Sequence, residues 1–434
     1  MRHPLRAATR DGPAEKHGPP ANKKARSMGG GSGYIPDNEA AAAPVSARID
    51  AVDVLRGLAL LGVLTINLVM EFRVSIFAQF LPPSGPASPI DRVVSGFLLV
   101  AVESKAFALF SLLFGVGLAI QFEHLAHRPD RVRLMLRRLL TLLAFGLVHL
   151  LLIWNGDILT EYALAGFVVL PFLFAAWRVL AAAASAAFLL FLALPWLPVP
   201  WSFPDGAWLR AHVAAANEGY GHGSYAVIQT FRVAETPAIA MLHLYAFPRT
   251  VALMLFGVLV WRSGILIQAG AHTGLLRGMG IGALAVGVIL SVLAGGIPIL
   301  SGAALPRFAA ACAGALAPVV LAMAYAALVV WAVTGTCWAR YLGWATPVGR
   351  MAFTNYVTQS VVLGLLFYGY GLGLMGRVGI AAGLGMAMAL YAAQVLTSRF
   401  WLRRHCFGPL EWLWRTFTYG RRQPWRRNLA APAR

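Results

Sequence analysis

Long apolar segments alternate with short polar connections along most of this chain. Ten segments approach the roughly 20 residues that an α-helix needs to cross a bilayer. Their approximate centres are Val63, Leu113, Leu143, Phe167, Leu189, Phe256, Val288, Leu321, Val362 and Met386. The run from Val93 to Phe122 exceeds one crossing, so we expect a separate interfacial helix before the spanning one. The pattern predicts an all-α fold, a polytopic transmembrane helical bundle of about ten spans.

Both ends of the chain differ from this pattern. Residues 1–47 are rich in Gly, Pro, Ala, Lys and Arg and have no apolar period, which predicts a disordered basic tail. Residues 421–434 form a second basic tail. Between the tails we expect a membrane domain over residues 48–250, with a long outer loop over 195–242, and a second membrane domain over 251–420. That loop either caps a site or rests on lipid headgroups, and its aromatic residues favour the second interpretation.

Composition and charge support the membrane assignment. Of the 434 residues, 59% are hydrophobic and 12% are charged, whereas soluble domains carry about a quarter charged residues. A net charge of +19 would indicate nucleic acid in a soluble protein, but basic loops and tails in the cytoplasm explain it here. We therefore expect membrane lipid and no nucleic acid as a partner. Counting Lys and Arg in alternate connections predicts an even number of spans with both termini cytoplasmic, an N-in/C-in topology.

Polar residues recur along the first apolar segment, RIDAVDVLRGLALLGVLTINLVMEF, residues 48–72. At 100° per residue, Asp53, Arg56, Asn67 and Glu71 fall on one narrow stripe of an α-helix. Polar groups within hydrocarbon usually face the interior of a bundle or a watery cavity. The stripe either lines such a cavity, or Asp53 and Arg56 form an interfacial pair while Asn67 hydrogen-bonds to another helix.

A second polar face is predicted in VGRMAFTNYVTQS, residues 348–360. Two adjacent rows with a spacing of four form this face: Arg350, Thr354 and Thr358, and Asn355 and Gln359. Arg350 would lie near the cytoplasmic mouth, level with Arg56. We predict that Arg56, Arg350 and Asn355 hold a phosphate-bearing ligand, because guanidinium groups bind phosphate in bidentate fashion. Anchoring of the helix by positive charge is the alternative.

Candidate acid–base residues occur in HLLLIWNGDILTEYAL, residues 149–164. His149 is expected near the outer end of a span, and the sequence Trp-Asn-Gly-Asp that ends at Asp157 predicts a turn. Near-neutral titration suits His149 to proton transfer, with Asp157 orienting the imidazole; the alternative is a packing histidine. The three cysteines lie far apart and no zinc spacing or phosphate-binding loop occurs, so we expect no metal site.

These segments together resemble YeiB-like membrane proteins, the domain-of-unknown-function 418 (DUF418) family. The resemblance covers most of the chain after Arg48. The segments that carry it are RIDAVDVLRGLALLGVLTINL, LFSLLFGVGLAI (109–120), HLLLIWNGDILTEYALAG (149–166), PVGRMAFTNYVTQS (347–360) and FGPLEWLWRTFTYG (407–420).

This family is similar to transmembrane acyltransferases, including the heparan-glucosaminide acetyltransferase group. The resemblance implies a bacterial-type cytoplasmic (inner) membrane protein that takes an acyl group from cytoplasmic acyl-CoA. The acceptor would be a hydroxyl or amine of a small molecule or glycan on the other side, and His149 is the candidate histidine for proton transfer. Asn67 would donate a hydrogen bond to the carbonyl oxygen. The alternatives are a transporter or lipid-handling carrier, and a non-catalytic scaffold.

Overall fold

A computed structural model describes residues 50–82, 88–197, 204–295 and 306–427. The predictions for residues 1–47 and for 428–434 of the C-terminal tail lie outside the described residues. Residues 48–434 form one compact unit. The boundary that we expected between residues 250 and 251 falls inside a continuous helix, α8 (Tyr225–Arg262).

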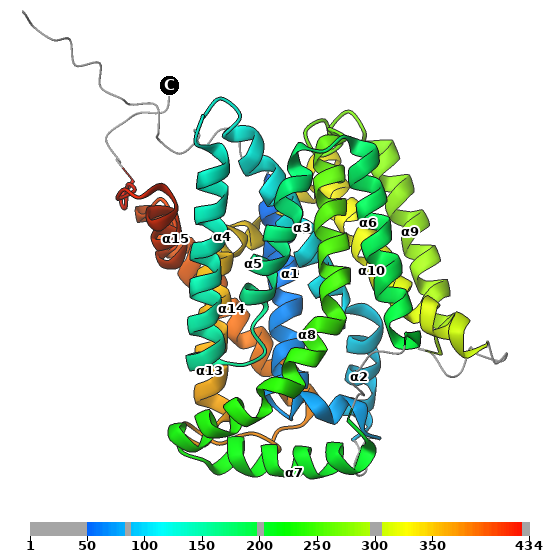
Figure 1. Cartoon of the computed structure of the whole chain (residues 1–434), viewed down its shortest axis with the longest axis vertical. Coiled ribbons are helices and arrows are strands. Elements are labelled where there is room, and N and C mark those ends of the chain that lie inside the picture. Colours follow the sequence, from blue (N-terminus) through cyan, green and yellow to red (C-terminus); the bar gives the residue numbers. More distant parts are fainter. Residues whose placement is uncertain (1–49, 83–87, 198–203, 296–305, 428–434) are drawn as a thin grey trace, which may run out of the picture. The chain divides into compact units, whose positions relative to one another are not determined.

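All regular secondary structure of the described residues is helical (Figure 1). The α-helices are α1 (Asp50–Ile66), α2 (Pro89–Ala101), α3 (Lys105–His124), α4 (Arg131–Val148), α5 (Ile158–Val169), α6 (Trp177–Ala193), α7 (Gly206–His222), α8 (Tyr225–Arg262), α9 (Thr273–Leu293), α10 (Arg307–Gly335), α11 (Ala339–Leu342), α12 (Thr346–Arg350), α13 (Ala352–Phe367), α14 (Ile380–Arg404) and α15 (Pro409–Tyr419). Two π-helical segments are η3 (Asn67–Phe72) and η5 (His149–Ile153). Short 3₁₀ segments are η4 (Ile76–Phe80), η6 (Leu170–Phe174), η7 (Leu194–Trp196) and η8 (Gly343–Ala345).

Eight helical segments of the described residues are long and apolar enough to cross a membrane. They are Asp50–Phe72, Pro89–His124, Arg131–Ile153, Trp177–Trp196, Tyr225–Arg262, Thr273–Leu293, Arg307–Gly335 and Ile380–Arg404. The other two predicted centres, Phe167 and Val362, fall in the shorter apolar segments Ile158–Phe174 and Ala352–Phe367. The chain is thus a polytopic helical membrane protein, as its apolar pattern predicts.

Helix α1 lies at the centre of the bundle. Its side chains Leu60, Val63 and Leu64 are completely buried, and it packs against α3, α10, α12 and α14. Peripheral helices instead present apolar side chains outward, for example Leu189 on α6 and Ile289 on α9. In water such an exterior would be unfavourable, whereas in a bilayer these side chains meet lipid.

Two glycines allow α3 and α8 to approach closely. A Cβ atom on Gly115 would lie 2.0 Å from the carbonyl oxygen of Met254, and one on Gly257 would lie 2.1 Å from that of Leu112. Both distances are far shorter than any van der Waals contact. Small residues permit this backbone approach in membrane helices, and they fix α8 against the core.

The long apolar run from Val93 to Phe122 is divided into two helices, as expected. Helix α2 ends at Ala101 and α3 begins at Lys105, with Ser104 in the left-handed conformation at φ 61°. Nζ of Lys105 donates to the carbonyl oxygen of Leu99 at 2.7 Å. It thereby satisfies one of the carbonyl groups that the end of α2 leaves without a helical partner.

We predicted a long loop over residues 195–242, but the described part of this segment is mostly helical. It contains α7 and the first half of α8. Asp205 caps α7 by accepting from the backbone N–H of Trp208 at 2.7 Å, and Ser224 caps α8. Alanines between these caps favour helix. Helix α7 crosses one end of the bundle, at the bottom of Figure 1; we call this the α7 end, and the opposite end the α15 end.

The helix predicted over residues 348–360 is also interrupted. Helix α12 stops at Arg350, Met351 leaves the helical conformation, and α13 starts at Ala352. The polar rows therefore contact two different neighbours. Thr354 binds Glu411 on α15, whereas Gln359 binds Gln394 on α14.

Candidate functional site

The two π-helical segments carry polar residues predicted near the outer end of the bundle. Asn67 and Glu71 lie in η3, and His149 begins η5. A π-helix has i→i+5 hydrogen bonds, and such segments within α-helices occur frequently at functional sites. The two segments meet at the α7 end, where the ring centroids of Phe72 and Trp154 are 4.7 Å apart.

His149 and Asp157 form a buried pair. Nδ1 of His149 lies 2.9 Å from Oδ1 of Asp157, and each residue is only 1% exposed. The two atoms are at ion-pair distance without the alignment of a formed hydrogen bond; catalytic hydrogen bonds commonly tighten when substrate binds. Nε2 of His149 is buried and has no hydrogen-bond partner among the described residues. This nitrogen therefore has unfilled hydrogen-bonding capacity.

The start of α5 holds Asp157 in position. Its carboxylate accepts the backbone N–H groups of Leu159 at 3.1 Å and Thr160 at 2.7 Å, which is the N-cap arrangement. The preceding bend at Asn155 and Gly156 is the turn that the sequence predicts. Because the helix terminus fixes the carboxylate, Asp157 can orient the imidazole of His149 without moving itself.

A second histidine–carboxylate pair lies one turn further along α5. Nδ1 of His243, on α8, is 2.7 Å from Oε2 of Glu161, and Thr250 donates to the other oxygen of the same carboxylate. The His243 side chain is 30% exposed and Glu161 is 9% exposed. Glu71 lies beside the turn that precedes α5, since its Oε2 would be 2.6 Å from a Cβ atom on Gly156. His243 is thus the more accessible histidine, and His149 the more deeply buried.

A third pair joins α7 to α8. Oε1 of Glu235 lies 2.7 Å from Nε2 of His212, and Oε2 accepts hydrogen bonds of 2.6 Å from both Tyr220 and Asn155. Burial, reinforced by the Glu235 carboxylate, raises the pKa of the Tyr220 hydroxyl, so this hydroxyl remains protonated and donates. Asn155 lies in the turn between His149 and Asp157, so this network fastens α7 over the first pair.

Asn67 is buried at 4% exposure and forms no hydrogen bond within the described residues. Its segment η3 packs against α13, and α13 also packs against η5, which begins with His149. The structure therefore brings Asn67 to the same end of the bundle as the His149–Asp157 pair. An unpaired buried amide is costly unless a ligand or water satisfies it.

The polar stripe predicted along the first helix is divided. Asp53 and Arg56 form an ion pair of 3.3 Å near the beginning of α1, whereas Asn67 and Glu71 lie at the opposite end. Between them, the core leucines of α1 are completely buried among apolar side chains. The π-helical turn after Ile66 also rotates the following residues away from ideal α-helical positions.

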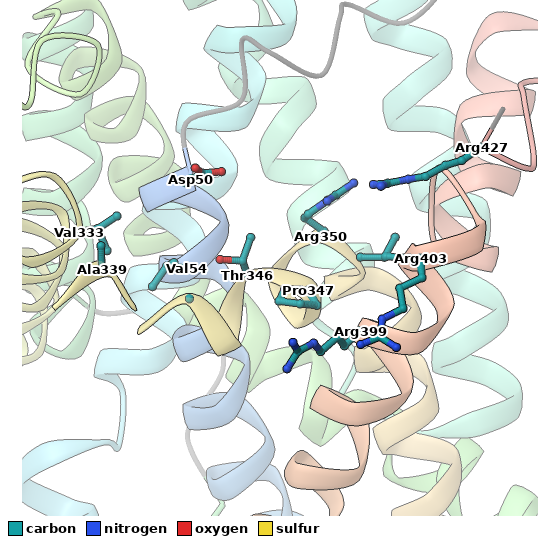
Figure 2. Close-up of a pocket in the computed structure, with 12 residues that line it drawn as sticks. Asp50, Val54, Val333, Ala339, Thr346, Pro347, Arg350, Arg399, Arg403 and Arg427 are labelled. Atoms are coloured by element: carbon teal, nitrogen blue, oxygen red, sulfur yellow. The ribbon is translucent and has the colours of Figure 1, made fainter. Parts of the chain in front are cut away.

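Arg350 lines a pocket of about 480 Å³ at the α15 end (Figure 2). Three further arginines line it, Arg399 and Arg403 from α14 and Arg427 from the segment after α15. Figure 2 shows Arg350 and Arg427 pointing toward one another. Asp50 is the only acidic residue among the described residues that line the pocket. Converging guanidinium groups with so little compensating charge favour binding of a phosphate or another polyanion.

The other two predicted phosphate ligands lie elsewhere. Arg56 is not among the residues that line the pocket; it pairs with Asp53 and lies beside Gly117 of α3. Asn355 is buried between α13 and α14, where its side-chain amide donates to Ser398 at 2.9 Å. The pocket thus contains Arg350 but neither Arg56 nor Asn355, although the sequence groups all three together.

Several residues of these sites are absent from the sequence predictions. Glu235 lies in the segment predicted as a loop and His243 directly follows that segment, and no spacing pattern links them to Glu161 or His212. For the pocket, Arg399 and Arg403 are four apart on one helix face, a signal that could have identified them. Part of the C-terminal tail is also fixed in place, because Arg426 forms a β-bridge with His405.

Several known proteins are similar to this chain in sequence. A family model described as "Protein of unknown function (DUF418)" matches residues 260–421. The uncharacterised protein YxaH of Bacillus subtilis (strain 168) is 34% identical over 400 residues, which is 87% of this chain and 96% of the relative. The uncharacterised protein YeiB of Escherichia coli (strain K12) is 28% identical over 393 residues, 85% of this chain and 95% of the relative. An uncharacterised 39.9 kDa protein encoded in the amylase 3' region of Bacillus acidopullulyticus is 28% identical over 391 residues, again 87% and 95%.

The match to YxaH extends over nearly the whole of that relative, and the family model covers the helices from the end of α8 to α15. The chain therefore belongs to the DUF418 family of YeiB-like membrane proteins.

Proposed function

We propose that this protein is a cytoplasmic-membrane acyltransferase. It takes an acyl group from cytoplasmic acyl-CoA and passes it to a hydroxyl or amine of a small molecule or glycan on the other side. The observation that carries the proposal is the His149–Asp157 pair, in which a carboxylate faces one ring nitrogen and the other nitrogen has no hydrogen-bond partner among the described residues. A histidine oriented by a carboxylate is the usual general base for activating a hydroxyl or amine.

In the proposed reaction, Nε2 of His149 accepts the proton of the acceptor O–H or N–H. The acceptor oxygen or nitrogen then forms a bond to the thioester carbonyl carbon, and the carbon–sulfur bond breaks. Coenzyme A leaves as a thiolate, which takes up the proton held by His149. Asp157 stabilises the imidazolium in between. The side-chain N–H group of the buried Asn67 donates to the carbonyl oxygen as negative charge develops there.

The pocket lined by Arg350, Arg399, Arg403 and Arg427 supplies the site for the phosphates of the donor. Within the described residues, the side chains of Arg399, Arg403 and Arg427 form no hydrogen bond or ion pair, so their donors are available. The helical rise from Asp50 to Asn67 is about 25 Å. Only the acylated end of the donor can therefore approach His149, while its phosphates stay at the α15 end.

A carrier is the second candidate, and the break between α2 and α3 is the observation that favours it. Interrupted membrane helices with charged residues at the break line substrate paths in many transporters. Glu103 and Lys105 flank Ser104 at such a break. The Lys105 ammonium is already engaged with Leu99, so the break has a structural explanation that needs no substrate.

The proposal is tested by replacing His149 with Ala in the full-length protein. Membranes containing the protein are supplied with acetyl-CoA and a cell-derived acceptor fraction, and release of free CoA thiol is measured. We expect transfer to fall about 10²–10⁴-fold in the variant, the usual contribution of a general base. Asp157→Asn keeps a helix cap, because Asn caps well, and it should also lose transfer.

His222→Ala is the matched control. His222 is also a histidine at the α7 end, but its side chain is 54% exposed, and its replacement should leave transfer unchanged. CoA should also raise the unfolding temperature of the detergent-purified wild-type protein. At a CoA concentration of 100 times its Kd, the free energy of unfolding should increase by about 2.7 kcal/mol. Full transfer by a folded His149→Ala protein would refute the assignment. Absence of CoA stabilisation would favour the carrier.

A further inference from the structure

An apolar pocket of about 490 Å³ lies beside α1, away from both polar ends. Helices α1, α2, α3, α10 and α14 all contribute to its walls. Representative lining residues are Leu58, Leu61, Phe97, Leu109, Leu328 and Met388. The volume falls within the roughly 300–1,000 Å³ range of ligand pockets in proteins.

The few polar side chains that line the pocket are all engaged with protein backbone. Thr65 donates to the carbonyl oxygen of Leu61, Tyr325 donates to that of Ala101, and Lys105 donates to that of Leu99. All other residues that line the pocket are apolar or glycine. The walls therefore suit an occupant with an apolar surface.

The mouth of the pocket opens toward the bilayer. Phe97 on α2 is 58% exposed and Met388 on α14 is 40% exposed, and both lie in segments apolar enough to span a membrane. Ile90 and Val93, also on α2, are more exposed still. Lipid is the medium in contact with these side chains, so a lipid chain can enter sideways without crossing water.

The length of the pocket matches one lipid chain. Along α1 it extends from Leu55 to Thr65, a helical rise of roughly 15 Å. The hydrocarbon core of a bilayer is about 30 Å thick, so the chain of one leaflet spans about half of it. Ala59 and Ala106, which are almost fully buried, also line the pocket.

From these observations we infer that the apolar pocket beside α1 is a binding site for one acyl chain of a membrane phospholipid. The inference is independent of the proposed acyl transfer, because it concerns a different surface of α1 and needs no donor or acceptor. The bound chain fills the space between α2, α10 and α14 and so stabilises the interrupted helix pair α2–α3.

The test uses the full chain in vesicles of phosphatidylcholine that contain a phosphatidylcholine with one diazirine-labelled acyl chain. After illumination, cross-linked peptides are mapped by mass spectrometry. We expect adducts on pocket residues such as Leu58 and Leu328. Met388→Trp places an indole at the mouth and should lower these adducts about tenfold, as expected from the loss of about 1.4 kcal/mol of chain binding.

Leu396→Trp is the matched control, since Leu396 lies on the same helix, is 68% exposed and does not line the pocket. It should leave the adducts on pocket residues unchanged. Equal labelling of the pocket in both variants would overturn the inference. So would labelling by a diazirine fatty acid but not by the phospholipid, because the occupant would then be a free fatty acid. If Met388→Trp fails to fold, the wild-type map decides: adducts confined to residues outside the pocket refute the site.

Discussion

Gly349→Ala provides the sharpest test of the arginine pocket. Gly349 precedes Arg350 on α12, and a Cβ atom there would lie 1.8 Å from the carbonyl oxygen of Asp53 and 2.9 Å from the backbone nitrogen of Gly57. Since Cβ contacts below 3.0 Å essentially never occur, α12 must move away from α1 by more than about 1 Å. The moving helix carries Arg350, whose bidentate bonding to a phosphate depends on its position.

The magnitude follows from the geometry. Overpacking of this kind costs about 1–3 kcal/mol. With an unfolding entropy of about 2.1 cal/mol/K per residue over a chain of this length, the unfolding temperature should fall by about 1–4 °C. The displaced Arg350 should raise the Kd for CoA about tenfold, equivalent to about 1.4 kcal/mol. Both quantities are measured by thermal unfolding of the purified protein over a series of CoA concentrations.

Gly343→Ala is the control for this experiment. Gly343 lines the same pocket, but a Cβ atom there would meet nothing within 4 Å. This variant should keep the wild-type unfolding temperature and CoA affinity. If Gly349→Ala behaves like Gly343→Ala in both respects, α12 does not position an anion-binding arginine and the reasoning fails.

Two further predictions concern stability alone. Gly115→Ala places a Cβ atom 2.0 Å from the carbonyl oxygen of Met254 and should destabilise the α3–α8 contact by about 1–3 kcal/mol. Gly282→Ala in α9 is the control: a Cβ atom there meets open space, so this variant should be neutral or slightly stabilising. Equal unfolding temperatures of the two variants would contradict this prediction. Burial raises the pKa of Glu411, although hydrogen bonds from Thr354 oppose the rise, so its protonated form is favoured in the folded state. A carboxyl group whose pKa is raised by folding stabilises the folded state at low pH, and this stabilisation is lost as the pH rises. The unfolding temperature of the wild type, relative to that of Glu411→Gln, should therefore fall as the pH rises from about 4.5. If this difference in unfolding temperature grows with pH instead, the pKa of Glu411 is not raised.

The membrane spans could be predicted from the sequence because each one is recorded locally, as a run of apolar residues of sufficient length. The turn before Asp157 and the His149–Asp157 proximity are equally local, since eight residues separate the pair. His243 and Glu235 approach their partners only because α8 bends across the α7 end, and no local pattern encodes that. Helix α7 was missed because its alanine-rich sequence has too few apolar residues for a span.

The predicted polar stripe on α1 and the predicted group of arginines differ from the structure, because a local pattern does not record how helices pack. The stripe assumes uniform rotation along the helix, but the backbone changes to a π-helix after Ile66. Arg56 and Arg350 lie at a similar depth in the bundle, because Gly349 packs against the α1 backbone at Asp53 and Gly57, but only Arg350 lines the pocket. The arginines that line the pocket together with Arg350 come from α14 and from Arg427, which reaches the pocket because the tail pairs with the end of α14 at His405.

The separation of the polar groups limits which reactions the bundle can support. Guanidinium groups collect at the α15 end, and four histidine–carboxylate pairs collect at the α7 end. The helix that joins the two ends is filled midway by completely buried Leu60, Val63 and Leu64. A phosphate cannot cross such a layer without a large desolvation cost, whereas an acyl group can pass through apolar surroundings. Any ligand that uses both ends must therefore have a charged part that stays at the arginines and an uncharged part that reaches His149.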